Sequence, residues 1–238
     1  MASGVPSESA KIQEQANASS ATFASHNIRN TNINTAPGVD LSDQQKVLVG
    51  SILDLFEGNP TLKHLSLWSK TATFADNITI ATGYDKFAAQ WYGLPAVFKP
   101  IQIQRHQVVS AGNPIELDLS NKYTVKGIKK EQVMDSRVKI HVGADGKIEK
   151  VEDRWNDNLP EGGISEVSSR VLVLPLTAAR ALVGLGAGVV WWAFCTVSWS
   201  WPFAAFRKLN AVTVPTMVKV PKNEEEDKKM QAERDQSS

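Results

Sequence analysis

The sequence predicts an α+β domain followed by an apolar segment, and three observations lead to this fold class. Helix-capping patterns and apolar residues at helical spacing occur between residues 42 and 97. Four strand-like runs then follow one another, at about 101–110, 114–126, 131–142 and 147–155. Residues 181–206 contain no charged residue. The expected order of elements is therefore ααβαββββ, with an apolar helix after the last strand.

The first two helices are predicted from their end signals. Ser42 and Gln45 have the spacing of a capping box, in which each side chain satisfies a free backbone amide of the other residue. Gly58 can adopt the left-handed conformation that ends a helix. Asn59-Pro60 then resembles the N-cap and first position of a short second helix, which we expect to end near Trp68.

A strand and a third helix are expected next. Residues 71–77 alternate between the two faces and are rich in β-favouring residues. The run from Thr82 to Asp85 has a second capping-box pattern, so we expect the third helix to start there. Proline does not continue a helix easily, and Pro95 is expected to close this one.

Composition excludes several classes of function. The formal net charge is +1, and no stretch alternates basic and aromatic residues, so nucleic acid is not an expected partner. The chain has one cysteine, Cys195, which excludes an intrachain disulfide and a cysteine-based zinc cluster. Its 4 histidines have no metal-binding spacing. We therefore expect no metal and no cofactor.

Alternation along the strands places a few polar residues on the apolar face. In 114–126 the inward set is expected to contain Asn121 and Tyr123 among apolar residues. In the last strand Asp153 shares a face with Val151 and Trp155. A carboxyl group in such surroundings tends to have a raised pKa and needs a partner.

The opposite face of 131–142 is expected to be charged and solvated. Met134, Val138, Ile140 and Val142 form its apolar set. The other face then carries Asp135, Arg137, Lys139 and His141. Alternating charges are typical of an exposed antiparallel surface, so we interpret His141 as a surface residue.

The order of elements and three local motifs together resemble the SnoaL-like branch of the nuclear transport factor 2-like superfamily. These motifs are "FAD" at the end of the first strand, "GYDKFAAQWYGL" in the third helix and "GKIEKVEDRWND" in the last strand. The resemblance covers about residues 41–158 and is closest to uncharacterised fungal-type members with a C-terminal apolar segment. It implies a cone fold, in which a strongly curved antiparallel sheet wraps around helices and encloses a pocket.

The resemblance also implies candidate catalytic residues. Relatives include ketosteroid isomerase, which uses a carboxylate base with a tyrosine and a protonated aspartate as hydrogen-bond donors. By resemblance Asp76 lies near the position of the base, and Tyr123 and Asp153 are candidate donors. The isomerase's own tyrosine has no clear counterpart in the first helix. The alternatives are that Asp76 caps a turn and that Asp153 makes a structural hydrogen bond or salt bridge.

Five further residues are candidates for ligand binding if they line the cone: Trp68, Trp91, His106, Asn121 and Trp155. Tryptophans in a cavity would favour a flat apolar ligand. The alternative for the three tryptophans is that they belong to the core. The strand alternation leaves the face of His106 ambiguous.

The domain organisation follows from shifts in composition. Residues 1–40 are expected to be disordered, 41–158 form the cone domain, 159–180 form a linker, and 207–238 form a polar, disordered tail. Residues 181–206 are predicted to be a transmembrane or membrane-inserted helix, because a helix of that length spans about 39 Å against about 30 Å of hydrocarbon. A single span is the preferred interpretation. Monotopic insertion and a soluble helix packed on the cone are the alternatives.

Two functions follow from this organisation. The leading hypothesis is a protein attached to an intracellular membrane, whose cone binds a small apolar ligand or forms a homodimer. The alternative is an isomerase, cyclase or dehydratase that acts on a lipid-soluble ring or polyketide through Asp76, Tyr123 and Asp153. Membrane lipid is the expected partner in both cases.

Overall fold

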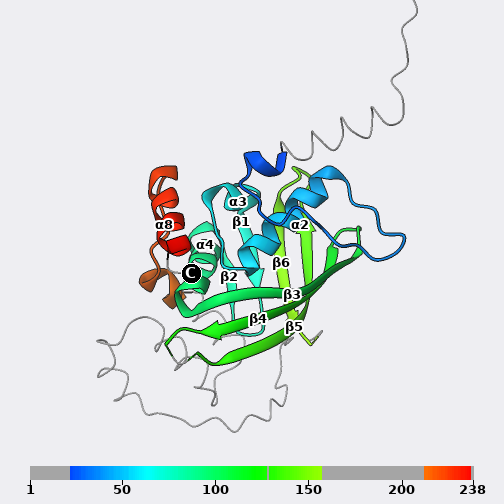
Figure 1. Ribbon diagram of the computed structural model, residues 1–238. Helices are drawn as coiled ribbons and strands as arrows, with labels where there is room; N and C mark the ends of the chain where they lie inside the picture. The colour runs from blue at the N-terminus through cyan, green and yellow to red at the C-terminus, as the bar shows by residue number, and fades with distance from the viewer. Residues whose placement is uncertain (1–21, 128, 157–211, 237–238) are drawn as a thin grey trace, which may run out of the picture.

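The computed structural model describes residues 22–127, 129–156 and 212–236 of the chain. Its centre is a six-stranded sheet with the order β2-β1-β6-β5-β4-β3. The strands are β1 (Trp68–Ala75), β2 (Ile80–Thr82), β3 (Phe98–Ser110), β4 (Ile115–Val125), β5 (Glu131–Val142) and β6 (Ile148–Trp155). The sheet curves strongly and does not close (Figure 1). The predicted α+β class is thus confirmed.

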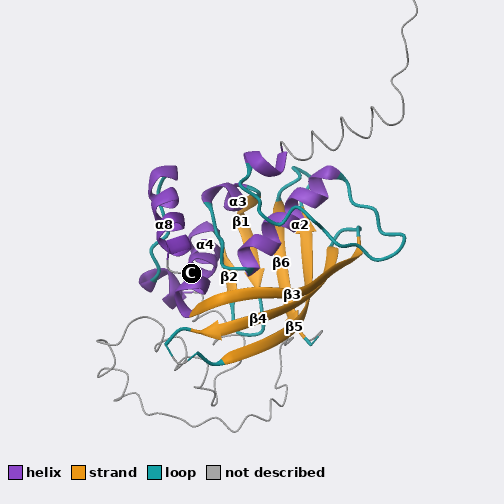
Figure 2. Cartoon of the chain, viewed as in Figure 1, coloured by secondary structure: helices purple, strands orange, loops and turns teal. Residues whose placement is uncertain are grey.

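The helices gather on the inner side of the curved sheet (Figure 2). They are α2 (Asp43–Phe56), α3 (Leu62–Ser66), α4 (Tyr84–Val97) and α8 (Glu224–Gln236). Helix α2 is buried on all sides from Val47 to Phe56 because it lies inside the curve of the sheet. Trp91 of α4 packs against Phe56, Trp68 and Phe74, with ring centroids 4.6–6.1 Å apart. This aromatic cluster joins both helices to β1.

The predicted helix ends and strand pairing are partly corrected by the structure. The capping box of Ser42 and Gln45 is present, and Gly58 has a φ of 74°. The short helix, however, is capped by Thr61, whose hydroxyl accepts from the amide of His64, and not by Asn59. Gly83 precedes α4 without a side-chain cap, and Pro95 lies inside that helix. The sheet is not wholly antiparallel, since β1 and β6 pair in parallel.

Residues 22–40 were expected to be disordered, but the structure places them against the domain. Phe23 and Ile28 are buried, and residues 34–36 hydrogen-bond to Val108 at the edge of β3. The carboxylate of Asp54, which is fully buried in α2, accepts from the backbone amides of Arg29 (2.8 Å) and Asn30 (3.0 Å). A buried carboxylate with these donors fixes a polar segment that has few apolar residues of its own.

Residues 212–236 also differ from the disorder expected of the polar tail. Val214 is buried, and Val218 lies against Gly93 of α4, where an added Cβ would meet it at 3.1 Å. Asp227 of α8 is buried and accepts from the Tyr92 hydroxyl at 2.7 Å and from the Leu62 amide at 2.9 Å. These bonds give a highly charged helix a specific docking position that its hydropathy does not predict.

The predicted membrane helix, 181–206, and the linker, 159–180, lie outside the described residues. Within 22–127, 129–156 and 212–236, no helix is both long enough and apolar enough to span a membrane. The apolar segment therefore stays a prediction from the sequence.

Candidate functional site

The concave face of the sheet carries a small group of polar residues among apolar ones. The strand register pairs Val138 with both Asp153 and Leu117, and it pairs Ser136 with Trp155. Phe74 pairs with Val151 in the parallel ladder. Two residues further along each strand, Asp76 therefore lies beside Asp153. We name these residues the interior polar cluster: Asp76, Asn121, Tyr123, Ser136, Asp153 and Trp155.

Asp153 is the most perturbed carboxyl group of the cluster. It is 5% exposed, and burial raises the pKa of its carboxyl to about 6, although hydrogen bonds from Trp155 and Ser136 act in the opposite direction. The Trp155 indole donates to Oδ2 at 2.9 Å. The other oxygen, Oδ1, is buried and makes no hydrogen bond within the usual distance. Asp153 therefore offers a desolvated acceptor that titrates near neutral pH.

Tyr123 is positioned so that its hydroxyl proton can be donated to another group. Its hydroxyl accepts from Asn121 Nδ2 at 3.1 Å, and the same amide group donates to the backbone oxygen of Phe56 at 3.1 Å. Burial and then the charge of Asp153 raise the pKa of Tyr123 well above its usual value, so the phenol is neutral. Because its oxygen is the acceptor in the Asn121 bond, the O–H group can donate elsewhere.

Asp76 takes the structural alternative that the sequence left open. Its Oδ1 accepts from the backbone amides of Ile78 at 2.8 Å and Thr79 at 2.5 Å, in the turn between β1 and β2. This turn is followed by β2, which the sequence analysis did not predict. The charge of Asp76 still reaches the interior, since it contributes to the raised pKa of Tyr123. Asp76 is therefore a turn cap at the border of the interior polar cluster.

The three candidate catalytic residues thus face one interior. Tyr123 and Asp153 lie within electrostatic range of each other; Tyr123 hydrogen-bonds to Asn121, and Asp153 to Trp155 and Ser136. Ser136 belongs to this interior group and was missed by the sequence analysis. The signal was present, because Ser136 lies between Met134 and Val138 on the inward-facing alternation.

The tryptophan candidates divide into two groups. Trp68 and Trp91 are each 2% exposed and belong to the aromatic cluster, which fills the space between α4 and β1. Trp155 is only partly buried and donates to Asp153. Trp68 and Trp91 are therefore core residues, and Trp155 is the tryptophan that belongs to the interior polar cluster.

His106 is used to hold the N-terminal segment. Its register partner is Leu119, and its Nε2 accepts from the backbone amide of Asn34 at 3.1 Å. Partial burial lowers the pKa of His106, which favours the neutral ring that can accept this bond. The described contacts therefore give His106 a structural role at the edge of β3.

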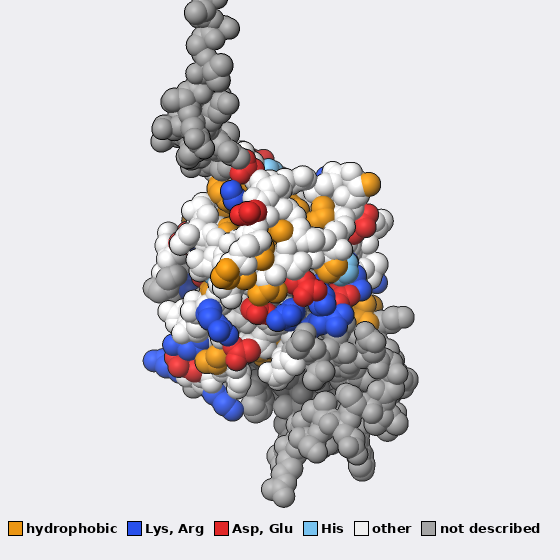
Figure 3. Space-filling model, turned by 90° about the vertical axis from the view of Figure 1, so that its right-hand side faces the viewer, with side chains coloured by type: hydrophobic (Ala, Val, Ile, Leu, Met, Phe, Trp, Pro, Cys, Tyr) orange, Lys and Arg blue, Asp and Glu red, His pale blue; other side chains and the backbone are white. Residues whose placement is uncertain are grey.

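The convex face of the sheet carries charge pairs, as the sequence predicted. Arg137 Nε lies 2.7 Å from Asp118, and Lys139 lies 3.0 Å from Glu116. Glu152 interacts with Lys150 and, at 2.6 Å, with Arg154, and these cations lower its pKa to about 2 against the cost of burial. Figure 3 shows basic and acidic side chains next to one another on one side of the molecule. His141 Nε2 lies 3.8 Å from Glu152, but burial lowers the pKa of this histidine, so it is a half-buried neutral neighbour of these charges and not the solvated residue that the sequence predicted.

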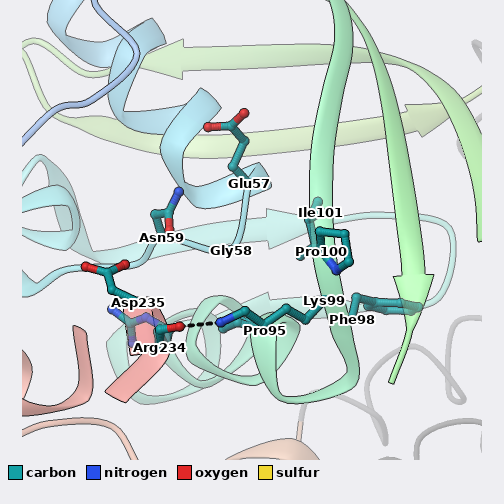
Figure 4. Close-up of a pocket in the computed structure, with 10 residues that line it drawn as sticks. All are labelled: Glu57, Gly58, Asn59, Pro95, Phe98, Lys99, Pro100, Ile101, Arg234 and Asp235. Carbon is teal, nitrogen blue, oxygen red and sulfur yellow. Dashed lines mark hydrogen bonds between the residues drawn. The ribbon is translucent and has the colours of Figure 1, made fainter. Parts of the chain in front are cut away.

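A cleft of about 200 Å³ lies at the surface, between the end of α2, the start of β3 and the end of α8 (Figure 4). Its charged side chains are bound to the protein itself. Lys99 donates to the backbone oxygen of Arg234, and Arg234 donates to that of Pro60 at 2.8 Å. Asp235 pairs with Arg29 at 3.2 Å. The cleft therefore lies in the contact region between α8 and the rest of the domain.

The described part of the chain contains no group of three or more His, Cys, Asp or Glu residues arranged to hold a metal ion.

Comparison with known proteins gives likenesses of structure. No family model matches the chain, and no curated protein matches it in sequence. An NTF2-like protein of unknown function from Exiguobacterium sp. 255-15 is 19% identical, with a TM-score of 0.39, over 47% of this chain and 99% of its own. A putative polyketide cyclase from Silicibacter sp. TM1040 is 17% identical, with a TM-score of 0.38, over 46% of this chain and 88% of its own.

A third solved structure is a hypothetical protein from Catenulispora acidiphila with a ketosteroid isomerase-like fold. It is 14% identical, with a TM-score of 0.38, over 44% of this chain and 82% of its own. At such identities these structures assign no activity to this chain. The fungal type, the homodimer and the intracellular membrane stay predictions.

Proposed function

We propose that the interior polar cluster binds a small, mostly apolar molecule that carries a hydroxyl or carbonyl group. The observation that carries this proposal is the buried Oδ1 of Asp153, which makes no hydrogen bond within the usual distance, although Ser136 acts on the same carboxyl group. A buried acceptor of this kind costs free energy unless a ligand or water satisfies it. Tyr123 provides a neutral O–H donor on the same face, and Asn121 Oδ1 is a second buried acceptor without a partner.

The surroundings of these groups set the class of ligand. Leu117, Leu119 and Val138 lie on the same face as the polar groups, so a ligand that reaches these groups would meet mostly apolar side chains. The polar groups then fix its orientation, as in ordinary small-molecule sites. A hydroxyl can donate to Asp153, and a carbonyl can accept from Tyr123.

Native mass spectrometry of the full chain, purified in mild detergent, tests this proposal. We expect an adduct with the mass of a small apolar compound, which a Tyr123→Phe and Asp153→Asn double variant loses. Thr73→Ala is a suitable control, because Thr73 bonds to Thr82 on an exposed part of β1. An adduct that survives in the double variant would place the binding site elsewhere.

A second candidate function is proton transfer by Asp153, as in an isomerase, cyclase or dehydratase. The specific observation in its favour is the carboxyl pKa of about 6, which suits a general base near neutral pH. Asp153 would remove a proton beside a carbonyl group, and Tyr123 would stabilise the negative charge on its oxygen. Asp76 is not assigned the base, because backbone amides occupy its Oδ1.

Deuterium exchange separates this function from simple binding. The purified complex is incubated in D2O, and the mass of the released compound is measured to detect deuterium bound to carbon. Exchange that is present in the natural chain and absent in Asp153→Asn supports proton transfer. An unlabelled compound in both samples would leave binding alone as the function.

Membrane attachment through residues 181–206 is also part of the proposal. The uncharged run is long enough to enter a bilayer, and attachment would bring the cone near lipid-soluble ligands. Flotation of the full chain with lipid vesicles tests it. Recovery of the protein only at the bottom of the gradient would contradict attachment.

A further inference from the structure

We propose that the cone domain and α8 lie on the same side of the membrane, and that one basic end of the domain faces anionic lipid headgroups. The proposal rests on the membrane attachment proposed above and adds its topology and its lipid preference. We define the basic end by three exposed lysines of the β4–β5 hairpin, Lys126, Lys129 and Lys130, with the exposed Val212 and Met217.

The residues on either side of 157–211 both pack on the same domain. Before this stretch, Asn156 donates its backbone amide to the backbone oxygen of Asp135 on β5. After it, Val214 and Val218 lie against Gly93 of α4, and Asp227 is buried under Tyr92 and α3. Both ends are therefore parts of one folded domain.

A folded domain lies on one side of a bilayer, because its polar backbone and charges cannot enter about 30 Å of hydrocarbon. A chain that leaves and rejoins the same domain must cross the membrane an even number of times, or not at all. This geometry disfavours the single span that the sequence analysis preferred. Among the alternatives, it favours monotopic insertion.

The residues on either side of 157–211 both meet the domain beside the β4–β5 hairpin. Asp135 lies near the start of β5, which follows the β4–β5 turn. Gly93 lies one turn before Val97 of α4, and the backbone oxygen of Val97 accepts from the amide of Lys126. The end of the domain that adjoins residues 157–211 is therefore the end where this turn lies.

That end of the domain is rich in lysine. The turn carries Lys126, Lys129 and Lys130, and Glu131, the next residue along the chain, is paired with Lys122 at 3.3 Å. The described part of the chain exposes three large hydrophobic residues, Val133, Val212 and Met217. Lysines and exposed apolar side chains are the two residue types that suit an interface of anionic headgroups and acyl chains.

The opposite end of the sheet provides a matched control. The β5–β6 turn contains Lys147 and lies at the other end of β5. Trp68 pairs with Ile148, so Lys70 is near that same end. The chain thus carries two lysines that the proposal places away from the membrane.

The test uses the full chain with vesicles of phosphatidylcholine, with and without phosphatidylserine. The two vesicle types compete for the protein, and its distribution is measured. We expect a preference for the phosphatidylserine vesicles, which Lys129→Glu with Lys130→Glu reduces by about 25-fold, at about fivefold per lysine. Lys70→Glu with Lys147→Glu should leave the preference unchanged.

Cysteine labels in a Cys195→Ser background report orientation. A fluorophore at Lys129→Cys should lose intensity on vesicles that contain a headgroup quencher, and one at Lys147→Cys should not. A membrane-impermeant thiol reagent should label Lys147→Cys and Glu233→Cys equally, because both lie on one side. Labelling of only one of the two positions would overturn the one-sided topology.

The vesicle experiments distinguish failure of membrane attachment from failure of the basic end. Absence of binding to either vesicle type would overturn membrane attachment itself. Binding with equal preference for both vesicle types, or equal quenching at both labels, would leave attachment standing and overturn the basic end.

Discussion

Glu152 and Asp153 are neighbours on β6, but the two faces of the sheet give them opposite acid–base behaviour. On the convex face, Lys150 and Arg154 lower the pKa of Glu152 to about 2. On the concave face, burial raises the pKa of Asp153 to about 6. Both side chains are 5–6% exposed, so burial alone does not explain the difference.

The difference lies in the partners. Glu152 is surrounded by charges that offset its desolvation. Asp153 has only neutral donors, Trp155 at 2.9 Å and Ser136, and its Oδ1 makes no hydrogen bond within the usual distance. Partner charges on one face stabilise the fold. The missing partner on the other face is a cost to folding, and it suits a group that meets a ligand.

The largest expected effect is on the stability of an Asp153→Asn variant. The folded pKa of Asp153 lies above its unfolded value of 3.8, so the group loses stabilising free energy as pH rises from about 4 to about 6. Asparagine does not titrate. The variant should therefore be more stable than the natural chain by about 3 kcal/mol at about pH 8, and by much less at about pH 3.

Urea unfolding at a series of pH values measures this difference. Asparagine keeps an oxygen that can accept from Trp155. A gain in stability that does not change with pH would argue against a raised pKa of Asp153 in the folded state.

The second-largest effect is a loss of folding stability in a Glu152→Gln variant. The folded pKa of Glu152 lies below its ordinary value of 4.5, so its stabilisation is present above about pH 4.5 and is lost as pH falls towards 2. Glu152→Gln should cost about 2 kcal/mol at about pH 7, after allowance for solvent screening, and almost nothing at about pH 2. The same unfolding series checks it, and a gain at neutral pH would contradict the account.

A third variant tests the assignment of Asp76 to its turn. Asp76→Ala removes the acceptor of two backbone amides and should cost about 1–2 kcal/mol of folding free energy. Asp76→Asn keeps an acceptor oxygen and should cost less. Thermal unfolding measures both. If Asp76→Ala is as stable as the natural chain but loses bound ligand, Asp76 belongs to the site and not to the turn.

The smallest effect on stability is expected from Tyr123→Phe. Asn121 keeps its bond to the Phe56 backbone, so the free energy of unfolding should change by less than about 1 kcal/mol. Ligand retention should fall about tenfold, since one hydrogen bond to the ligand is lost. Native mass spectrometry at graded detergent concentration measures the loss. Equal retention in both proteins would remove Tyr123 from the site.

Much of the sheet could be predicted because its strands alternate clearly. Ile115, Leu117 and Leu119 fix the face of β4, and the same alternation places Asn121 and Tyr123 inside. β2 was missed because its three residues are too short a run to show a period. The alternation also could not show that Asp76 is bound by amides of the turn that follows it.

The two terminal segments could not be predicted because they are held by long-range polar bonds. Asp54 fixes Arg29 and Asn30, and Asp227 fixes α8 to Tyr92. Neither partner lies near in sequence, and the segments themselves have few apolar residues. The composition of such segments resembles that of disordered chains until their partners are known.

Titration of Asp153 by NMR shows whether this carboxyl group is protonated near neutral pH. The indole N–H of Trp155 donates to this carboxylate, so its resonance in a ¹⁵N spectrum of tryptophan-labelled protein reports the charge, once Trp155→Phe has assigned it. We predict a titration midpoint near pH 6 that Asp153→Asn abolishes. A midpoint near the ordinary aspartate value of about 4 would contradict the account, because Asp153 would then be no different from a solvated surface carboxylate.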